Sequence, residues 1–199
     1  MYLQSLLVIF CLIICSYSQD TAGVTPLPED DPRNFQQQDA TKLVELSGIH
    51  WVKKRTYKVT TEQGESTCEY AKIYGKTATE DGYTLELGAK LGSTWTSKNQ
   101  TLLLEKTEPH PKPNVLKFTR LKADGPLGHP LLYSDYQKCH IVRIMKKNSE
   151  DYRCDMLLTE EASKQSPPPE CETKFAQYCN GISYDVYSIS CDERGTKTA

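Results

Sequence analysis

The sequence lacks the patterns of an enzyme and of a nucleic-acid-binding protein. Its four histidines show no HExxH spacing, and the chain has no GxSxG elbow and no glycine-rich phosphate loop. The formal net charge is only −2, and the basic residues are not gathered into a patch that would attract nucleic acid. We therefore expect a protein with no catalytic residues, no cofactor, no metal and no nucleic-acid partner.

Long hydrophobic runs are also scarce, and the one that exists stands at the start. Leu6 to Cys15 is unbroken apolar sequence, which is too short for a bilayer span of about 20 residues. Ser16 and Ser18 occupy the small-residue positions before a cut at Gln19, so residues 1–18 are predicted to be a signal peptide. Because no later stretch is apolar enough to cross a membrane and no lipid-anchor motif is present, we expect a secreted protein with no membrane partner.

Cysteine, in contrast, is plentiful outside the leader. Such a set in a secreted chain indicates an extracellular disulfide framework, here made by Cys68, Cys139, Cys154, Cys171, Cys179 and Cys191. The spacing alone leaves every connectivity open. All six thiols have partners to find, so none is expected to be a nucleophile. The single N-glycosylation sequon begins at Asn99 and is expected on an exposed turn.

Composition divides the chain after the leader into three parts. Residues 19–38 are polar, rich in proline and acidic at Glu29 to Asp31, which predicts a disordered N-terminal arm. Residues 39–192 form one domain, which opens with a short helix over 39–46 that has Asp39 as its N-cap. Residues 193–199 are expected to be a flexible tail.

Within the domain the hydrophobic pattern takes a period of two, which is typical of strands. The predicted strands are Trp51–Thr61, Thr67–Tyr74, Tyr83–Ala89, Thr101–Lys106, Val115–Leu121, Leu131–Tyr133, Cys139–Met145 and Tyr152–Leu158. Eight short strands with mostly short turns indicate an all-β, up-and-down antiparallel barrel, although a sandwich would share this periodicity. A helix over Glu170–Asn180 and a last strand-like piece over Tyr184–Ser190 follow.

Alternation assigns the polar and aromatic side chains to faces. Trp51, Arg55 and Tyr57 share one face of the first strand, and Phe118 and Arg120 share one face of a later strand. An eight-stranded barrel can hold one small ligand, and if the aromatic faces point inward the two arginines do as well. The alternative is that the aromatic rings are ordinary core and that the arginines reach the solvent at the rim.

Several short words, taken in order, carry a resemblance that extends over nearly the whole mature chain. They are YSDYQKC at 133–139, CETKFAQY at 171–178 followed by Cys191, STCEY at 66–70, and the weaker words QDA at 38–40, TYK at 56–58 and CDML at 154–157. In these words the chain resembles the tick salivary lipocalins of the histamine-binding family.

The resemblance implies an eight-stranded antiparallel lipocalin barrel with a C-terminal helix packed on its wall. By the same match Cys68 should pair with Cys191 and Cys139 with Cys171, which leaves Cys154 to pair with Cys179. It further implies a disulfide-stabilised, non-catalytic monomer that sequesters a small inflammatory mediator of the host. Family ligands are histamine, serotonin or eicosanoids, and a few members bind a complement protein.

Amine-binding members of that family surround the ligand's ammonium with carboxylates and aromatic faces, which is chemically sound for a desolvated cation. The chain departs from this pattern at Thr41, Thr60, Gly128, Pro130, His140 and Leu157. It retains Tyr57, Phe118 and Asp155, with Asp39 near the mouth.

An inward guanidinium from Arg55 or Arg120 suits a carboxylate better than an ammonium. The departures therefore favour an anionic eicosanoid or fatty acid over an amine. Its tail would lie along Trp51, Leu85, Leu116 and Met156.

A second function remains open at this level. A barrel filled by its own side chains could grip a host protein, such as a complement component, through its loops. The segment Thr107–Asn114 and the acidic arm are the candidates for such a surface. Whether the barrel is hollow discriminates between the two functions.

Overall fold

The computed structural model describes residues 26–61, 64–77, 81–148 and 151–195, so the predicted signal peptide lies outside it. The strands are β1 (Ile49–Arg55), β2 (Thr60–Thr61), β3 (Gly64–Lys76), β4 (Tyr83–Leu91), β5 (Thr94–Glu105), β6 (Val115–Phe118), β7 (Leu127–Ser134), β8 (Cys139–Arg143), β9 (Cys154–Thr159) and β10 (Tyr184–Asp185). The α-helices are α2 (Ala40–Leu43), α3 (Glu160–Ser163) and α4 (Pro169–Tyr178), and the 3₁₀-helices are η1 (Pro32–Gln37) and η2 (Ile189–Gly195).

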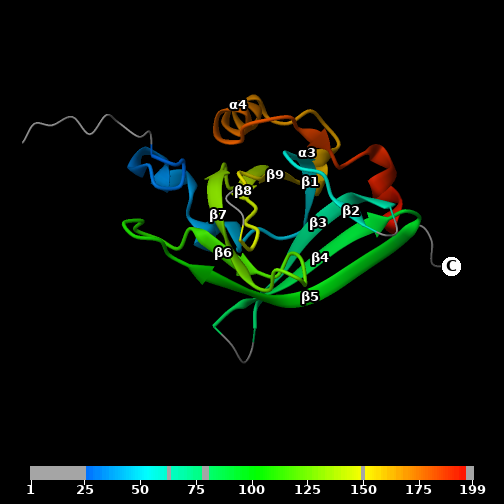
Figure 1. Ribbon diagram of the computed structural model, residues 1–199, viewed down its shortest axis with the longest axis horizontal. Coiled ribbons are helices and arrows are strands. Elements are labelled where there is room, and N and C mark those ends of the chain that lie inside the picture. The colour runs from blue at the N-terminus through cyan, green and yellow to red at the C-terminus, as the bar shows by residue number, and fades with distance from the viewer. Residues whose placement is uncertain (1–25, 62–63, 78–80, 149–150, 196–199) are drawn as a thin grey trace, which may run out of the picture.

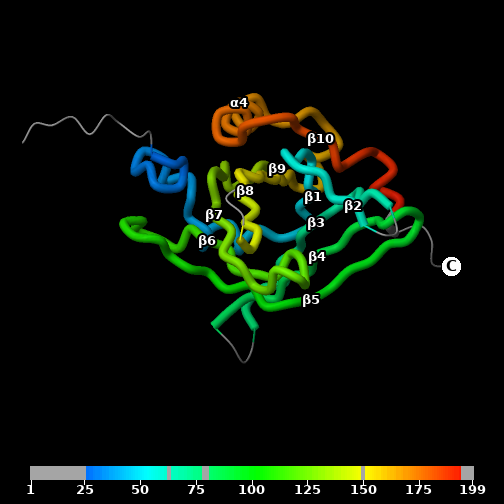
Figure 2. Tube along the Cα trace, viewed as in Figure 1, coloured from blue at the N-terminus to red at the C-terminus, as the bar shows by residue number. Residues whose placement is uncertain are grey.

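Eight strands close into an antiparallel barrel (Figures 1 and 2). Strands β3 to β9 pair in sequence order, and β1 pairs with both β9 and β3. The short strands β2 and β10 attach to β3 and β1 outside this ring. The predicted barrel is confirmed, and the sandwich is excluded because the sheet returns to its own first strand.

The hairpin of β4 and β5 is longer than the hydrophobic pattern predicts. Its register is continuous from Tyr83 opposite Leu102 to Leu91 opposite Thr94. Apart from Trp95, the sequence between Thr94 and Gln100 is polar on both faces, so alternation gives no strand signal there. Asn99 consequently lies within β5, with an exposed side chain, and not on a turn as expected.

The N-terminal segment differs from the disordered arm that composition predicts. Residues 19–25 lie outside the described part, but residues 28–38 are ordered against the barrel. Gln38 Nε2 donates to the carbonyl of Leu132 over 3.1 Å, and Arg143 Nη2 donates to Glu29 at 3.0 Å. Tyr178 in α4 donates to Asn34 at 2.9 Å. These specific polar contacts offset the ordering entropy that low hydrophobicity leaves uncompensated.

The N-cap prediction for the short helix is confirmed. Asp39 Oδ1 accepts a hydrogen bond from the backbone N–H of Thr41 at 3.0 Å. Ala40 and Leu43 then turn inward and pack in the core cluster that contains Leu85 and Leu131. The helix α2 therefore packs its apolar face into the barrel interior.

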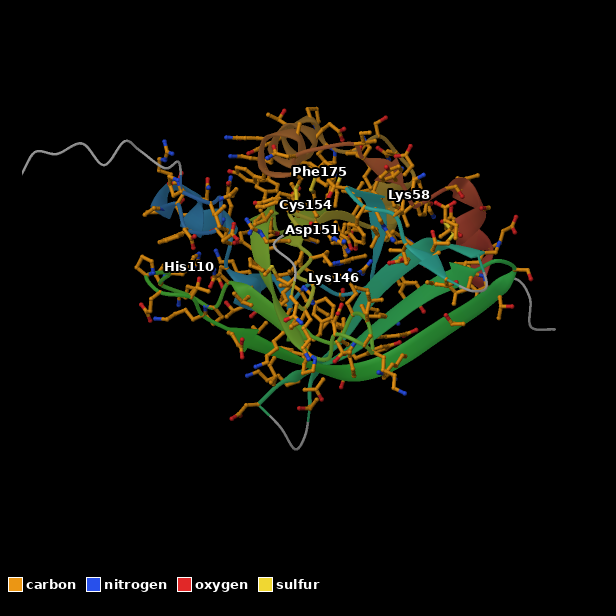
Figure 3. The ribbon with its side chains drawn as sticks, in the orientation of Figure 1. Lys58, His110, Lys146, Asp151, Cys154 and Phe175 are labelled. Carbon is orange, nitrogen blue, oxygen red and sulfur yellow. A yellow bond between two sulfur atoms is a disulfide. The ribbon has the colours of Figure 1, made fainter. Side chains whose placement is uncertain are left out.

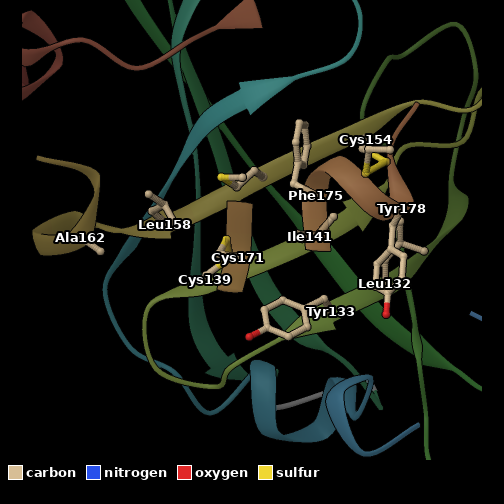
Figure 4. Close-up of a cluster of buried hydrophobic side chains, with 12 residues drawn as sticks. Leu132, Tyr133, Cys139, Ile141, Cys154, Leu158, Ala162, Cys171, Phe175 and Tyr178 are labelled. Carbon is tan, nitrogen blue, oxygen red and sulfur yellow. A yellow bond between two sulfur atoms is a disulfide. The ribbon is translucent and has the colours of Figure 1, made fainter. Parts of the chain in front are cut away.

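Helix α4 covers the outer wall formed by β8 and β9 (Figure 1). Phe175 and Tyr178, which the i, i+3 spacing assigns to one face, pack on Ile141 and Leu158 (Figure 4). The disulfides that tie the helix region to this wall are Cys139–Cys171 and Cys154–Cys179, and Cys68–Cys191 links β3 to η2. The pairing is the one that the resemblance implies.

The C-terminal segment is less strand-like than its sequence indicates. Of the predicted strand Tyr184–Ser190, two residues form β10, and η2 then continues into the predicted tail as far as Gly195. Residues 196–199 lie outside the described part. Within that part, none of the helices has the length and apolar character needed to span a bilayer.

Gly88 in β4 allows the ring of Tyr70 to lie against the strand backbone. A Cβ atom at position 88 would lie 2.2 Å from the Tyr70 ring. This ring is held in place because it packs edge-on to Trp51 and because its hydroxyl donates to Glu86 at 2.5 Å. We expect Gly88→Ala to destabilise the protein by about 1–3 kcal/mol through overpacking, measured by urea unfolding.

The matched control is the same substitution in a Tyr70→Leu background. There the clash is gone, and reduced backbone entropy of the unfolded chain should make the change neutral or stabilising by about 0.5 kcal/mol. Equal destabilisation in both backgrounds would contradict the steric explanation.

Candidate functional site

The barrel is hollow. It encloses a cavity of about 520 Å³, which is within the range of small-molecule sites. Its apolar wall is made by residues from five strands and from α2, namely Leu43, Val52, Leu85, Leu87, Leu116, Phe118, Val142 and Leu157. Such a lining can hold an apolar ligand, and it argues against an interior filled by side chains.

A β-bulge in β1 decides which of its residues face the cavity. The register with β9 shifts between Val52 and Lys54, so alternation is interrupted at Lys53. His50 and Val52 line the cavity before the bulge, and Trp51 points to the outer side. The prediction that Trp51 shares the ligand face with Arg55 is therefore wrong, because strict alternation cannot anticipate an inserted residue.

On the outer side Trp51 belongs to an aromatic cluster. Its ring lies 5.4 Å from that of Tyr70 and 5.6 Å from that of Tyr187, next to the Cys68–Cys191 disulfide. Trp51 is almost completely buried there. Trp51 thereby stabilises the pairing of β1 with β3, the two strands that close the barrel.

Four charged side chains meet inside the barrel at its polar end, and they are Arg55, Glu69, Arg120 and Asp155. Glu69 lies between two arginines, with its Oε1 2.8 Å from Arg55 Nη2 and its Oε2 2.8 Å from Arg120 Nη2. Arg120 Nη1 also lies 3.4 Å from Asp155 Oδ2. The formal charges of this cluster cancel. The arginines predicted from alternation do point inward, but both are already paired with protein carboxylates.

The two carboxylates of the cluster respond differently to their surroundings. Burial acts to raise the pKa of Glu69, but Arg120 and Arg55 outweigh it, so the net pKa is lowered. Burial raises the pKa of Asp155, and Arg120 opposes this shift only in part. Glu69 is thus the firmly ionised partner of both guanidinium groups.

Tyr57 forms the wall beside the cluster. The guanidinium carbons of Arg55, Arg120 and Arg153 lie 5.3, 5.5 and 5.4 Å from its ring centroid. Burial, reinforced by Asp155, raises the pKa of the Tyr57 hydroxyl well above its ordinary value. The ring face that an amine ligand would need is therefore already occupied by cations of the protein.

Glu69 is one site residue that the sequence did not reveal. It belongs to the word STCEY, in which alternation from the buried Cys68 would turn it outward. The register of β3 shifts between Thr67 and Tyr70, and Cys68 has a positive φ of 51°. This irregularity brings Glu69 to the inner face, and the composition of the segment does not predict it.

The remaining predicted ligand residues divide between the cavity and the wall. Phe118 lines the cavity, and its ring lies 4.4 Å from that of His129. Asp39 is the N-cap of α2 and is not a lining residue. Met156 points outward into the cluster beneath α4, because it follows the inward Asp155 in β9.

Two histidines at the other end of the cavity also escaped prediction as site residues. His50 and His140 both line it, and their rings are stacked with centroids 4.8 Å apart. Burial lowers the pKa of His50 to about 4 and that of His140 well below its ordinary value, so both rings are neutral at pH 7. The disulfide at Cys139 requires that residue to face α4, which is the signal that could have placed His140 inside.

The mouth of the cavity is cationic. Its charged lining residues outside the cluster are Lys58, Lys98, Lys146, Arg153 and Asp124. Lys58 and Lys146 are labelled in Figure 3. Arg153 is paired with Asp151 at 2.9 Å, and Lys58 lies over the ring of Tyr184. The three exposed lysines leave a positive potential at the entrance. In the described ranges no three His, Cys, Asp or Glu side chains are grouped to hold a metal ion.

Removing the central carboxylate should leave two buried guanidinium groups undercompensated. We expect Glu69→Gln to lower the free energy of unfolding by about 3–5 kcal/mol, measured by chemical denaturation. The matched control is Glu105→Gln, which breaks the exposed pair with Lys117 and should cost less than about 1 kcal/mol. Similar small losses in both variants would contradict the importance of the buried network.

His129 should make folding sensitive to acid. Burial, with Arg120 nearby, lowers its pKa to about 4, whereas an unfolded histidine titrates near 6.5. Its contribution is fully present above pH 6.5 and is lost as the pH falls toward 4, on the order of 3 kcal/mol.

The measurement is the free energy of unfolding against pH for the wild type and for His129→Gln. The effects of all other groups are shared by both proteins, so the difference isolates position 129. We expect a shallower acid loss in the variant, and parallel curves would refute the assignment.

Comparison with known proteins identifies the family of the chain. The family model described as tick histamine binding protein matches residues 28–193. No curated protein sequence matches the chain.

Solved structures similar to the chain are lipocalins with divergent sequences. A serotonin complex of AM182 is 18% identical, covers 76% of this chain and 91% of its own, and has a TM-score of 0.55. Japanin from Rhipicephalus appendiculatus bound to cholesterol is 10% identical, with coverages of 72% and 95% and a TM-score of 0.52. Insecticyanin from the tobacco hornworm Manduca sexta is 11% identical, with coverages of 78% and 85% and a TM-score of 0.58.

These structures share the barrel, and the family model covers most of the chain. The protein belongs to the tick histamine-binding protein family of lipocalins.

Proposed function

We propose that the protein is secreted and sequesters one small, predominantly apolar ligand in its barrel without converting it. The single observation that carries this proposal is the cavity of about 520 Å³ with apolar walls. The three disulfides support an extracellular location. A hollow interior also supports small-molecule binding over the loop-mediated capture of a host protein.

The charges favour a ligand with an acidic head group, such as a fatty acid or an eicosanoid. The sequence predicts that Arg55 and Arg120 attract an anion. The buried cluster is formally neutral, however, so these two arginines do not provide that attraction. The attraction comes from the mouth, where Lys58, Lys98 and Lys146 face the entrance. An apolar tail in the cavity with its carboxylate among these lysines satisfies both regions.

A monoamine is the second candidate, because a structural neighbour is a serotonin complex. In this chain Asp155 is paired with Arg120, and three guanidinium groups surround the ring of Tyr57. An entering ammonium would meet those cations. The geometry therefore ranks the amine second.

Calorimetric titration of the mature protein with arachidonate, serotonin and histamine tests the proposal. We expect arachidonate to bind most tightly, and Lys146→Glu to weaken it by about tenfold. The control is Lys112→Glu, an exposed lysine that does not line the cavity, which should leave affinity unchanged.

Filling the cavity distinguishes interior from surface binding. Leu116→Trp and Val142→Phe each place an aromatic ring in the apolar wall. Each should abolish arachidonate binding in protein that circular dichroism shows to be folded. Binding that survives both substitutions would place the ligand elsewhere. Tighter binding of serotonin than of arachidonate would favour the amine.

A further inference from the structure

The stacked histidines form a second polar region of the cavity, away from the charged cluster. In the sheet register His140 lies opposite Leu157, and Asp155 is two residues further along β9. Two strand residues correspond to about 7 Å. Both imidazoles therefore face the same cavity as the cluster, at a different depth, among the apolar side chains of Leu157 and Val142.

Each ring has one nitrogen with no hydrogen-bond partner among the residues that the structure describes. These are the Nε2 atoms of His50 and His140, and both are buried. The side chain of His140 is 1% exposed. A buried polar atom without a partner loses the free energy of its hydration. Because both residues line the cavity, a polar group of a bound ligand is one partner that could satisfy these atoms.

The hydrogen bond of the other nitrogen assigns the tautomer of His140 when the Ser134 hydroxyl is taken as the donor. Its Nδ1 lies 2.9 Å from Ser134 Oγ, which also accepts the backbone N–H of Tyr136 at 2.9 Å. The Ser134 hydroxyl therefore has its proton available for Nδ1 of the neutral ring. With Nδ1 accepting, the proton of His140 resides on Nε2, so this ring presents an N–H donor to the cavity.

His50 has the opposite arrangement. Its ring interacts with the backbone of Ser47 in the sense that stabilises the protonated nitrogen, as an N–H donating to a carbonyl does. Because Nε2 has no partner in the described structure, this N–H is on Nδ1. The Nε2 atom of His50 then offers a lone pair, so the two stacked rings carry one donor and one acceptor.

We infer that His50 and His140 form a subsite for a hydroxyl group carried by an otherwise apolar ligand. An alcohol oxygen accepts from His140 Nε2–H while its proton is donated to the Nε2 lone pair of His50. An ammonium has no lone pair for His140, and a carboxylate has no proton for His50. This inference rests on the proposed function, since it names a chemical feature of the ligand bound in the same cavity.

The tautomers can be measured without any ligand. Long-range proton–nitrogen NMR of the wild-type protein at pH 7 should show the proton of His140 on Nε2 and that of His50 on Nδ1. The reverse assignment of either ring would overturn the inference.

Binding is tested with two matched probes, n-decanol and its methyl ether, which differ in the hydroxyl proton. Wild-type protein should prefer the alcohol by about tenfold or more. His50→Phe and His140→Phe should each reduce this ratio to about one. Leu157→Ala is the control, because it removes only apolar contact and should weaken both probes equally.

The outcomes separate this inference from the proposed function. Equal binding of alcohol and ether by the wild type would overturn the hydroxyl subsite while the cavity-binding function stands. Failure of both probes and of arachidonate to bind would overturn both. If the phenylalanine variants do not fold, Ser134→Ala keeps both rings and should lower the preference several-fold; an unchanged preference would contradict the inference.

Discussion

The pairing of β1 with both β9 and β3 is the constraint on which the rest of the structure depends, because it converts a sheet with two edges into a closed wall. The closing seam is reinforced from outside. Trp51 of β1 and Tyr70 of β3 pack together, and Cys68 is tied to Cys191 beside them. Without this seam there is no interior, and neither the cavity nor the buried charges would be separated from water.

A charged side chain inside the closed barrel loses its hydration, and in this protein the buried charges compensate one another. Glu69 is shared by Arg55 and Arg120, and Asp155 accompanies Arg120. Charges taken out of water are tolerated only when they are paired. This compensation removes both the carboxylates and the guanidinium groups from easy competition for a ligand, so in the proposed function recognition falls to the mouth lysines and to neutral polar groups inside.

The chain combines the barrel of its family with an interior of its own composition. The structural neighbours in complex with serotonin and with cholesterol show that proteins of similar fold bind chemically unlike molecules. In this chain apolar lining predominates, with charge at one depth and neutral imidazoles at another.

Local pattern determined much of this protein. Period-two alternation and turn residues predicted the strands of the barrel, Asp39 was recognisable as an N-cap, and the word similarity implied the three disulfides. Phe118 and Arg120 do face the cavity, because β6 and the residues that follow it keep strict alternation. The strands, the N-cap and the alternation depend on residues near one another in sequence, which is why the sequence carries them. The disulfides join residues that are far apart in sequence, and only the family resemblance implied their pairing.

Only the tertiary structure decided the composition of the site. The bulges in β1 and β3 exchanged Trp51 for His50 and brought Glu69 inside, and a one-residue shift leaves almost no mark in the hydrophobic pattern. Likewise the ordering of residues 28–38 depends on contacts with distant elements, such as Glu29 with Arg143. Which charges neutralise one another, and which polar atoms remain for a ligand, follows from three-dimensional proximity that no local sequence signal encodes.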